Sequence, residues 1–490
     1  MNKIVFNNLD EIIYKEKMPN GVDVYLYPTN KTKNFYMTIS VKLGGKVKKY
    51  KVNGSKVKKV IPGTAHFLEH KIMNFTNREK ETKIINELGL YANAYTSFDI
   101  TNYNMFGSKD PKASLKLLLD LFYNLNINKT NVASEKGIIS EEFKMYENNP
   151  NFRINKQIIN NVFNKSYLKD ALVGNLEQIN KISVKDLKEV YNDFYTTNNT
   201  FIIITGNFDL NEILEFLRNY MKNIKKTSKN IKVLKIKDQN NVVNKNMEME
   251  ESISIPRVIY SLKINKRNID IKNKILKRYY LNFICSALFS NTSSIYEKYK
   301  NNKLMYSMSY DITDCESFYL INLKIISDNV DKLIKNLKKD MKKPKIDSKT
   351  FERKKKMFLN DLVLGFENIE EVEDMIANHI IRTNKIINNS FDLLKSMNYK
   401  EMNKVLSSID FDEGREGKRE WILQHTNFPL EKVIFCLEPE DKANWANQNA
   451  WLIDDRKKSL EPFAKAGGNA VEFTGDWEKT VAYLSDMMKG

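Results

Sequence analysis

A polar stretch rich in Lys and Asn, residues 225–251, separates two halves of the chain that repeat one pattern of apolar residues. Each half starts with alternating or β-branched apolar runs, which are typical of strands, and continues with amphipathic runs, which are typical of helices. This order predicts an α+β fold with two units of similar plan, joined by a polar linker. We find no residue-level repeat that would prove a duplication.

The pattern places strands and helices at specific residues. Ser183 is predicted as the N-cap of one helix, because a hydroxyl at that position can accept a hydrogen bond from the first turn. In the first half we expect strands at 22–27, 35–43, 95–106 and 200–205 and helices at 111–125 and 131–147. In the second half we expect a strand near 258–264, helices at 272–288 and 294–299, strands within 305–326, and long helices from 330 onward.

The composition changes abruptly after Ser408. All four Trp residues lie beyond it, and residues 409–490 carry a net charge of −5, whereas residues 1–408 carry +23. The junction lacks the Gly, Ser or Pro enrichment of a natural linker, so a gene fusion and an engineered chimera are both open readings. The predicted boundaries are 1–228 for the first domain, 229–251 for the linker, 252–408 for the second domain and 409–490 for the tail.

Several classes of protein are excluded. The apolar runs fall far below the roughly 18–20 residues of a membrane helix. The first twenty residues contain Asp10, Glu11 and Glu16 and no continuous apolar core, so they do not resemble a signal peptide. Cys285, Cys315 and Cys436 form no CxxC pair, so a reducing, cytoplasmic location fits best. The net charge of +18 comes from Lys spread among Asn and Ile without a recognition motif, which indicates solvated surface rather than a nucleic-acid partner.

The strongest chemical signal is the segment 62–70, which contains two of the four histidines of the chain. On a helix, His66 and His70 project from one face, four residues apart, close enough to share a metal ion. Neutral imidazoles suit zinc, and Glu69 beside them could take a proton from an activated water. The alternative is a helix that carries these residues without binding metal.

A catalytic zinc needs a third protein ligand, and a carboxylate of the same unit is the economical choice. The helical run 135–147 contains four glutamates, Glu135, Glu141, Glu142 and Glu147. Glu135 and Glu142 lie seven residues apart, two helical turns, and therefore on one face. Taken singly, each of the four could equally be a solvent-exposed charge.

These motifs resemble those of the M16 family, the inverted zincins of the pitrilysin and insulinase group, in which HxxEH is followed by ExxxxxxE. The resemblance implies that His66, His70 and Glu142 bind zinc. It also implies that Glu69 is the general base and that Glu135 orients the site. It covers about residues 1–410, is closest to small bacterial members of the processing-protease type, and implies two similar α+β sandwich domains with zinc in the first.

The resemblance extends to substrate and partner. Residues 91–98 are similar to the family's edge strand, which implies that Asn93 and Ala94 bind an extended peptide. Family members often place an Arg and a Tyr seven residues apart in the second half, and here Tyr306 has Tyr299 in the Arg position. The resemblance therefore implies a dimer, with a heterodimer favoured over a homodimer, in which another chain supplies the missing group. Taken by itself, Tyr306 fits a plain core aromatic residue better than a residue that binds substrate.

The tail is similar to the closing part of a haloacid-dehalogenase-type phosphatase, in segments 433–436, 450–456 and 466–471 and at Lys442. Residues 410–412 imitate the DxD element of that family, but fewer than fifty residues separate them from Asp454. This spacing is too short for the intervening strands and helices. We therefore interpret the tail as a fragment without catalysis of its own.

The sequence thus predicts a zinc metalloendopeptidase that cuts short or unfolded peptides, with processing of leader or targeting peptides as a plausible role. One alternative is a non-catalytic partner subunit of a heterodimeric M16 peptidase. The intact His66, Glu69, His70 and Glu142 argue against it, because an inactive subunit does not require all four. Another alternative is a phosphohydrolase that acts through the tail.

Overall fold

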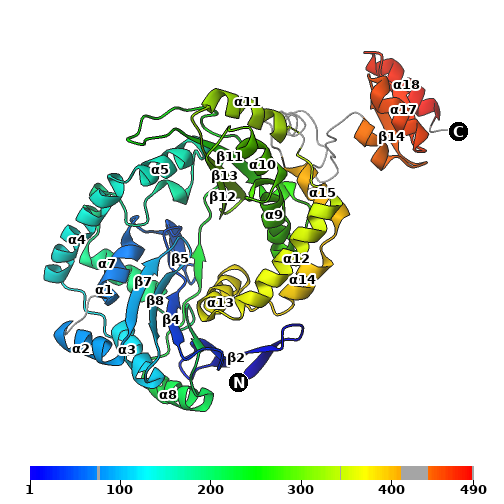
Figure 1. The fold of residues 1–490 in the computed structure, drawn as a ribbon. Coiled ribbons are helices and arrows are strands. Elements are labelled where there is room, and N and C mark those ends of the chain that lie inside the picture. The colour runs from blue at the N-terminus through cyan, green and yellow to red at the C-terminus, as the bar shows by residue number, and fades with distance from the viewer. Residues whose placement is uncertain (74–77, 343, 410–439, 488–490) are drawn as a thin grey trace. The chain divides into compact units, whose positions relative to one another are not determined.

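The computed structural model describes residues 1–73, 78–342, 344–409 and 440–487 (Figure 1). Contacts divide the chain into two compact units. The first comprises Met1–Pro256, Thr313–Leu320 and Lys349–Met397, and the second comprises Arg257–Ile312, Ile321–Ser348 and Asn398–Gly490. Both units contain helices and strands, as the pattern predicts. Within the described residues, no helix combines the length and the apolar character that crossing a bilayer requires.

A seven-stranded sheet forms the centre of the first unit, in the order β1-β2-β3-β9-β4-β8-β7. β3 and β9 are parallel, and the other neighbouring pairs are antiparallel. β9 is buried along its whole length, whereas β7 is an edge of the sheet. The strands are β1 (Asn2–Phe6), β2 (Glu11–Lys17), β3 (Asp23–Pro28), β4 (Phe35–Val41), β7 (Tyr91–Thr96), β8 (Thr101–Gly107) and β9 (Thr200–Gly206).

The prediction of one extended stretch at 95–106 was wrong, because a turn divides it into β7 and β8. The backbone N–H of Ser97 donates to the carbonyl of Ile100 at 2.8 Å, and the Ser97 hydroxyl accepts from the N–H of Ile100 at 3.1 Å. Ser closes turns in this way by replacing backbone partners with its side chain. The turn matters for function because it folds β7 back as the edge strand.

Helices cover one face of the sheet and form the main core with it. β4 shows the alternation that directs this packing: Met37 and Ile39 lie in the main core, whereas Thr38 points to the opposite face. Burial of each Leu or Phe in such a core stabilises the fold by roughly 1.5–3 kcal/mol. The helices of this part are α1 (Thr64–Met73), α2 (Arg78–Leu88), α3 (Pro111–Tyr123), α4 (Lys129–Glu147), α5 (Pro150–Val162), α6 (Leu176–Lys181), α7 (Val184–Phe194) and α8 (Leu210–Lys222).

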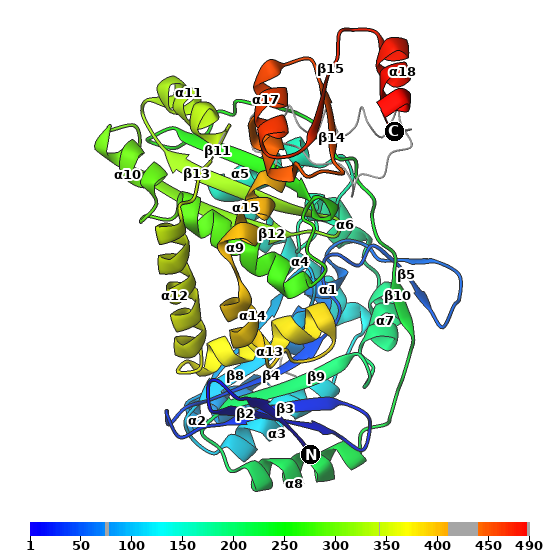
Figure 2. The same ribbon diagram turned by 90° about the vertical axis from the view of Figure 1, so that its right-hand side faces the viewer.

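The opposite face of the sheet is covered by α13 (Ile369–Thr383), as Figure 2 shows. A second apolar cluster joins strand residues such as Tyr27 and Ile203 to Phe366 and Ile376. Residues 366–386 lie in the predicted second domain, yet they pack on the sheet of the first unit. The helices α12 (Ser348–Gly365) and α14 (Ser390–Ser396) flank α13 in the sequence.

A smaller sheet in the order β11-β13-β12 lies mostly in the second unit. Its strands confirm the predicted strands near 258–264 and within 305–326, and α9 and α10 confirm the predicted helices. The elements are β11 (Arg257–Asn265), β12 (Ser307–Asp314), β13 (Phe318–Ile326), α9 (Lys274–Phe289), α10 (Ser294–Asn301), α11 (Val330–Met341) and α15 (Tyr399–Ser408).

The predicted linker contributes a strand of its own. β10 (Ile231–Val233) pairs antiparallel with β5 (Lys49–Val52), which also pairs with the short β6 (Lys58–Lys59). The division into compact units does not test the predicted domain boundaries, which stay predictions.

The described part of the tail forms a small parallel pair of strands, β14 (Trp451–Asp454) and β15 (Asn469–Glu472), connected through α17 (Lys457–Lys465). Asp454 is buried and forms an ion pair with Lys442. The helix α18 (Trp477–Met487) follows. The DxD-like residues 410–412, the segment 433–436 and Cys436 lie outside the described residues, so the phosphatase-like origin of the tail stays a prediction.

Candidate metal centre

The helix α1 begins where the sequence predicts, and two close backbone contacts fix its start. Gly63 has φ of +93°, and a Cβ there would lie 2.6 Å from the carbonyl oxygen of Val173. Only glycine fits a position that needs both the left-handed conformation and this approach. The Thr64 hydroxyl donates to the carbonyl of Ile61 at 2.7 Å. The entry of α1 is therefore fixed against a neighbouring loop, and the histidines follow within two turns.

The structure brings His66, His70 and Glu142 together. The Nε2 atom of His66 lies 3.6 Å from one carboxylate oxygen of Glu142, and the Nε2 atom of His70 lies 3.4 Å from the other. One ligand atom from each residue lies within 4.8 Å of the others. The two imidazole rings are 4.5 Å apart at an angle of 54°. Two nitrogens and one carboxylate thus converge from α1 and α4.

This spacing fits zinc. Zinc holds nitrogen and oxygen ligands at about 2.0–2.2 Å, so two ligands of a tetrahedral site lie roughly 3.3–3.6 Å apart. The two distances from Glu142 match that separation and exceed the usual length of a hydrogen bond. Three protein ligands would leave a fourth position for water or substrate. The assignment of these residues as ligands stays a prediction.

The site is electrostatically biased towards binding a cation. The neighbouring imidazoles of His66 and His70 hold the pKa of Glu142 far below its usual range. Burial alone would lower the pKa of His70, but the adjacent carboxylates of Glu135 and Glu142 raise that pKa to about 9. A metal ion competes with the proton on an imidazole. Binding of zinc through His70 would therefore release a proton at neutral pH.

Glu135 lies behind His70 rather than among the convergent atoms. Its Oε1 is 3.0 Å from Nδ1 of His70, and its side chain is buried. A carboxylate at this place favours the tautomer with the proton on Nδ1, so that the lone pair of Nε2 faces Glu142. The seven-residue spacing on α4 thus places Glu135 and Glu142 on one side of α1.

Glu69 is buried beside the histidines and is held by the edge strand. The hydroxyl of Thr96, at the end of β7, donates to Oε2 of Glu69 at 2.5 Å. This contact connects a carboxylate of α1 to the strand that the sequence associates with substrate. Sequence reasoning did not identify Thr96, although it lies within the stretch 91–98.

Asn93 and Ala94 lie in the middle of β7. The N–H of Ala94 donates to the side-chain oxygen of Asn93 at 2.8 Å. Because its acceptor is not on β8, this N–H points away from the sheet, toward the open edge. The structure therefore places both residues where an added strand would contact them; their role in substrate binding stays a prediction.

Tyr306 belongs to the second unit, and its side chain is 59% exposed. The interpretation of Tyr306 as a core aromatic residue was therefore wrong. Its hydroxyl donates to Asp328. Tyr299, by contrast, is fully buried and donates to Asp340 at 2.9 Å, so it fills the core of its unit. A role of Tyr306 at a substrate stays a prediction.

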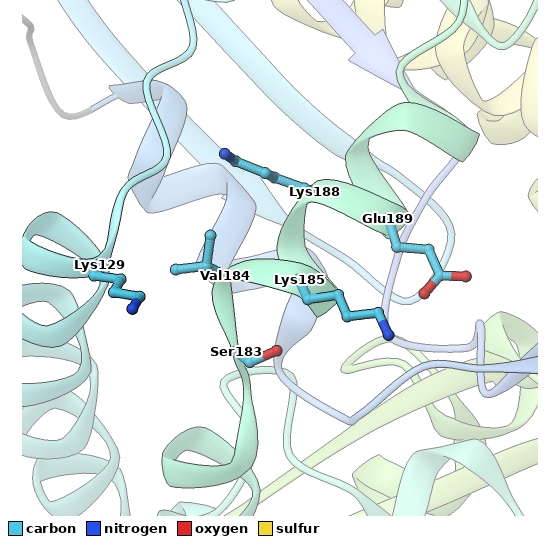
Figure 3. A pocket seen from close by; sticks show the side chains of 6 residues that line it. All are labelled: Lys129, Ser183, Val184, Lys185, Lys188 and Glu189. Carbon is cyan, nitrogen blue, oxygen red and sulfur yellow. The ribbon is translucent and has the colours of Figure 1, made fainter.

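One pocket of the first unit lies at the beginning of α7, and Figure 3 shows its lining. None of the residues of the metal cluster contributes to it. Its lining contains three lysines, as expected on a surface rich in Lys. Glu189 forms an ion pair with Lys58, with Nζ 2.9 Å from Oε1. The lining residues are Lys129, Ser183, Val184, Lys185, Lys188 and Glu189.

Two family models match the chain. Residues 56–176, which include the whole metal cluster, match the model described as Insulinase (Peptidase family M16). Residues 181–358 match the model described as Peptidase M16 inactive domain. The description of the second model agrees with the absence of a metal cluster from that range among the described residues.

Curated relatives and solved structures that are named as proteases or peptidases also match the chain. The zinc protease YmfH of Bacillus subtilis is 30% identical over 314 residues, which cover 63% of this chain and 73% of that protein. The beta subunit of the rat mitochondrial-processing peptidase is 28% identical over 160 residues, a third of each protein. An M16-like peptidase structure from Alicyclobacillus acidocaldarius has a TM-score of 0.76 at 21% identity, covering 82% of this chain and 96% of that one.

Proposed function

The chain belongs to the M16 family of peptidases, and from this premise we propose that it is a zinc-dependent endopeptidase. The observation that carries the proposal is the convergence of His66, His70 and Glu142, with Glu69 buried beside them. Two imidazoles, a carboxylate ligand and a separate carboxylate base are the parts that metal-assisted hydrolysis of a peptide bond needs.

Each side chain has a distinct task in this proposal. Zinc, when bound, supplies a Lewis acid that polarises the scissile carbonyl and activates water. Glu69 takes the proton of the attacking water and passes it to the leaving amine. Thr96 fixes one oxygen of Glu69 by its 2.5 Å hydrogen bond. Glu135 fixes the ring of His70.

We propose extended peptides as substrates, because β7 is an edge strand whose N–H at Ala94 points outward. A peptide can add to such an edge through main-chain hydrogen bonds, with side chains on alternate sides setting specificity. Asn93 and Ala94 would contact it. Processing of leader or targeting peptides is the role we favour, since one relative is named as a subunit of a processing peptidase.

We further propose a two-chain enzyme in the cytoplasm, a heterodimer rather than a homodimer. Tyr299 is buried in its own unit and cannot replace the missing Arg. A second chain would therefore supply the group that binds substrate together with Tyr306. A non-catalytic partner subunit is the alternative; the intact metal cluster favours the catalytic role. A phosphohydrolase acting through the tail is a weaker alternative, because Asp454 is already paired with Lys442.

Metal analysis of the purified full-length chain, together with a peptide-cleavage assay, tests the proposal. The wild type should contain one zinc per chain and cleave peptides, and His70→Ala should lose both. His379→Ala, which changes a partly buried histidine of α13, is the matched control and should keep zinc. Stoichiometric zinc in His70→Ala, or a wild type without zinc, would refute the metal centre.

A further inference from the structure

Lys71 follows the last histidine of the motif and is buried, which is unusual for lysine. Its side chain is 2% exposed, and its Nζ lies 3.5 Å from Oε2 of Glu135. Lysine ammonium groups are almost never fully buried unless they are paired, because loss of water is costly for a charge. The position of Lys71 therefore depends on Glu135.

Glu135 contacts two consecutive residues of α1, one with each oxygen. Oε1 is 3.0 Å from Nδ1 of His70, and Oε2 is 3.5 Å from Nζ of Lys71. A carboxylate that is held at both oxygens has one orientation. Without the ammonium, one oxygen of a carboxylate that is only 4% exposed would lose its cationic partner. The carboxylate could then turn away from His70.

The charges of the centre also need Lys71. Glu69, Glu135 and Glu142 bring three carboxylates to a largely buried region. A zinc ion would bring two positive charges to these carboxylates, and Lys71 brings a third. In a medium of low dielectric constant, opposite charges at such short distances attract one another strongly.

From this geometry we infer that Lys71 is a positioning residue of the zinc centre: it holds Glu135, which in turn orients His70 towards the metal. The inference rests on the proposed zinc site. It goes beyond the ligand set, because it assigns a role to a cation that contacts neither metal nor substrate. Loss of partners that orient metal ligands typically lowers metal affinity by about 10–100-fold.

The test measures zinc affinity of the full-length chain by competition with a chromophoric chelator. Lys71→Met keeps the length and apolar stem of the side chain and should weaken zinc binding by about 10–100-fold. Lys71→Arg restores the charge and should stay within about three-fold of wild type. Lys83→Met, which changes a lysine that is 75% exposed on α2, is the control and should have no effect.

A double variant separates positioning from general packing. In a Glu135→Gln background, the change Lys71→Met should alter zinc affinity by less than about two-fold, since the carboxylate that Lys71 holds is gone. The comparison of Glu135→Gln with the double variant tests the positioning role even if Lys71→Met alone does not fold. The double variant should fold, because it removes both members of the ion pair and leaves no buried charge without its partner. Circular dichroism in excess chelator confirms folding.

Two results would overturn the inference: wild-type zinc affinity in folded Lys71→Met, or an equally large effect of Lys71→Met in the Glu135→Gln background. Failure of the proposed function gives a different result, namely a wild-type chain that binds no zinc. The two failures are therefore distinguishable in one set of titrations.

Discussion

Two buried carboxylates on opposite sides of the sheet of the first unit have contrasting surroundings. Glu135, on the side of α1, is 3% exposed and has the ammonium of Lys71 and the ring of His70 as partners. Glu373, on α13, is 1% exposed and accepts a 2.7 Å hydrogen bond from the hydroxyl of Thr38.

The two carboxylates differ in the charges of their neighbours. Burial raises the pKa of Glu373 to about 7, and the nearby Asp374 and Glu370 add to this effect. Glu135 is similarly buried but lies beside the ammonium of Lys71. Burial without a neighbouring cation thus raises the pKa of a carboxyl group, as it does at Glu373. On the side of α1, Glu142 converges with two histidines, and these three residues form the candidate metal centre.

Removing a carboxylate from each side in turn should give the largest contrast. Glu69→Gln should keep zinc and lower kcat/KM for peptide cleavage by about 10²–10⁴-fold, because the base that accepts the proton of water is lost. Glu373→Gln should leave kcat/KM unchanged. Steady-state kinetics with metal analysis checks both, and an active Glu69→Gln would exclude this residue as the base.

A matched pair of threonines sharpens the contrast further. Thr96→Val removes the hydroxyl that holds Glu69 and should lower kcat about ten-fold with little change in KM, since a hydrogen bond to a charged group contributes about 1.5–3 kcal/mol. Thr96→Ser should restore the rate. Thr38→Val removes the equivalent hydroxyl from Glu373 and should not affect catalysis. Equal kinetics of Thr96→Val and wild type would argue against the positioning of Glu69.

The smallest expected effect concerns stability and pH. The pKa of Glu373 rises from 4.5 to about 7 on folding, so the folded chain binds more protons between these values and the free energy of unfolding falls as pH rises through that window. Above pH 7 this destabilisation amounts to at most about 3 kcal/mol. Glu373→Gln should therefore raise Tm by several degrees at pH 8 and change it little at pH 5.

Thermal unfolding at both pH values checks this prediction. The control is Glu371→Gln, which changes an exposed carboxylate of the same helix and should give a small, similar shift at both pH values. A shift for Glu373→Gln that is equal at pH 5 and pH 8 would show that the carboxyl group is not the source.

Local patterns in the sequence predicted the parts of the fold that depend on near neighbours. The helix start at 62–64, the N-cap Ser183 and the pairing of His66 with His70 are contacts within a few residues, and the structure confirms the first two. The helical period places each pair on one face of its own helix, and the resemblance to the M16 motifs implied that Glu142 of α4 joins the histidines of α1.

Contacts between distant residues could not be predicted in this way. Thr38 and Glu373 are separated by 335 residues. No local sequence pattern predicts that α13 packs on the sheet of the first unit. The burial of Lys71 was missed for the same reason, since a lysine next to a histidine looks like surface until its partner on α4 is placed. The turn at Ser97 was missed because hydrophobic periodicity continues on both sides of it.

The packing of residues 366–386 on the first sheet has a consequence for synthesis on the ribosome. The chain completes β9 at Gly206, and another 180 residues must be made before Ile386 emerges. At about 5–20 residues per second, this takes roughly 10–35 s. During that interval Tyr25, Tyr27 and Ile203 face water on a nearly finished sheet. The first unit thus leaves the ribosome with an exposed apolar surface on its sheet. We expect this surface to bind chaperones that recognise apolar strands.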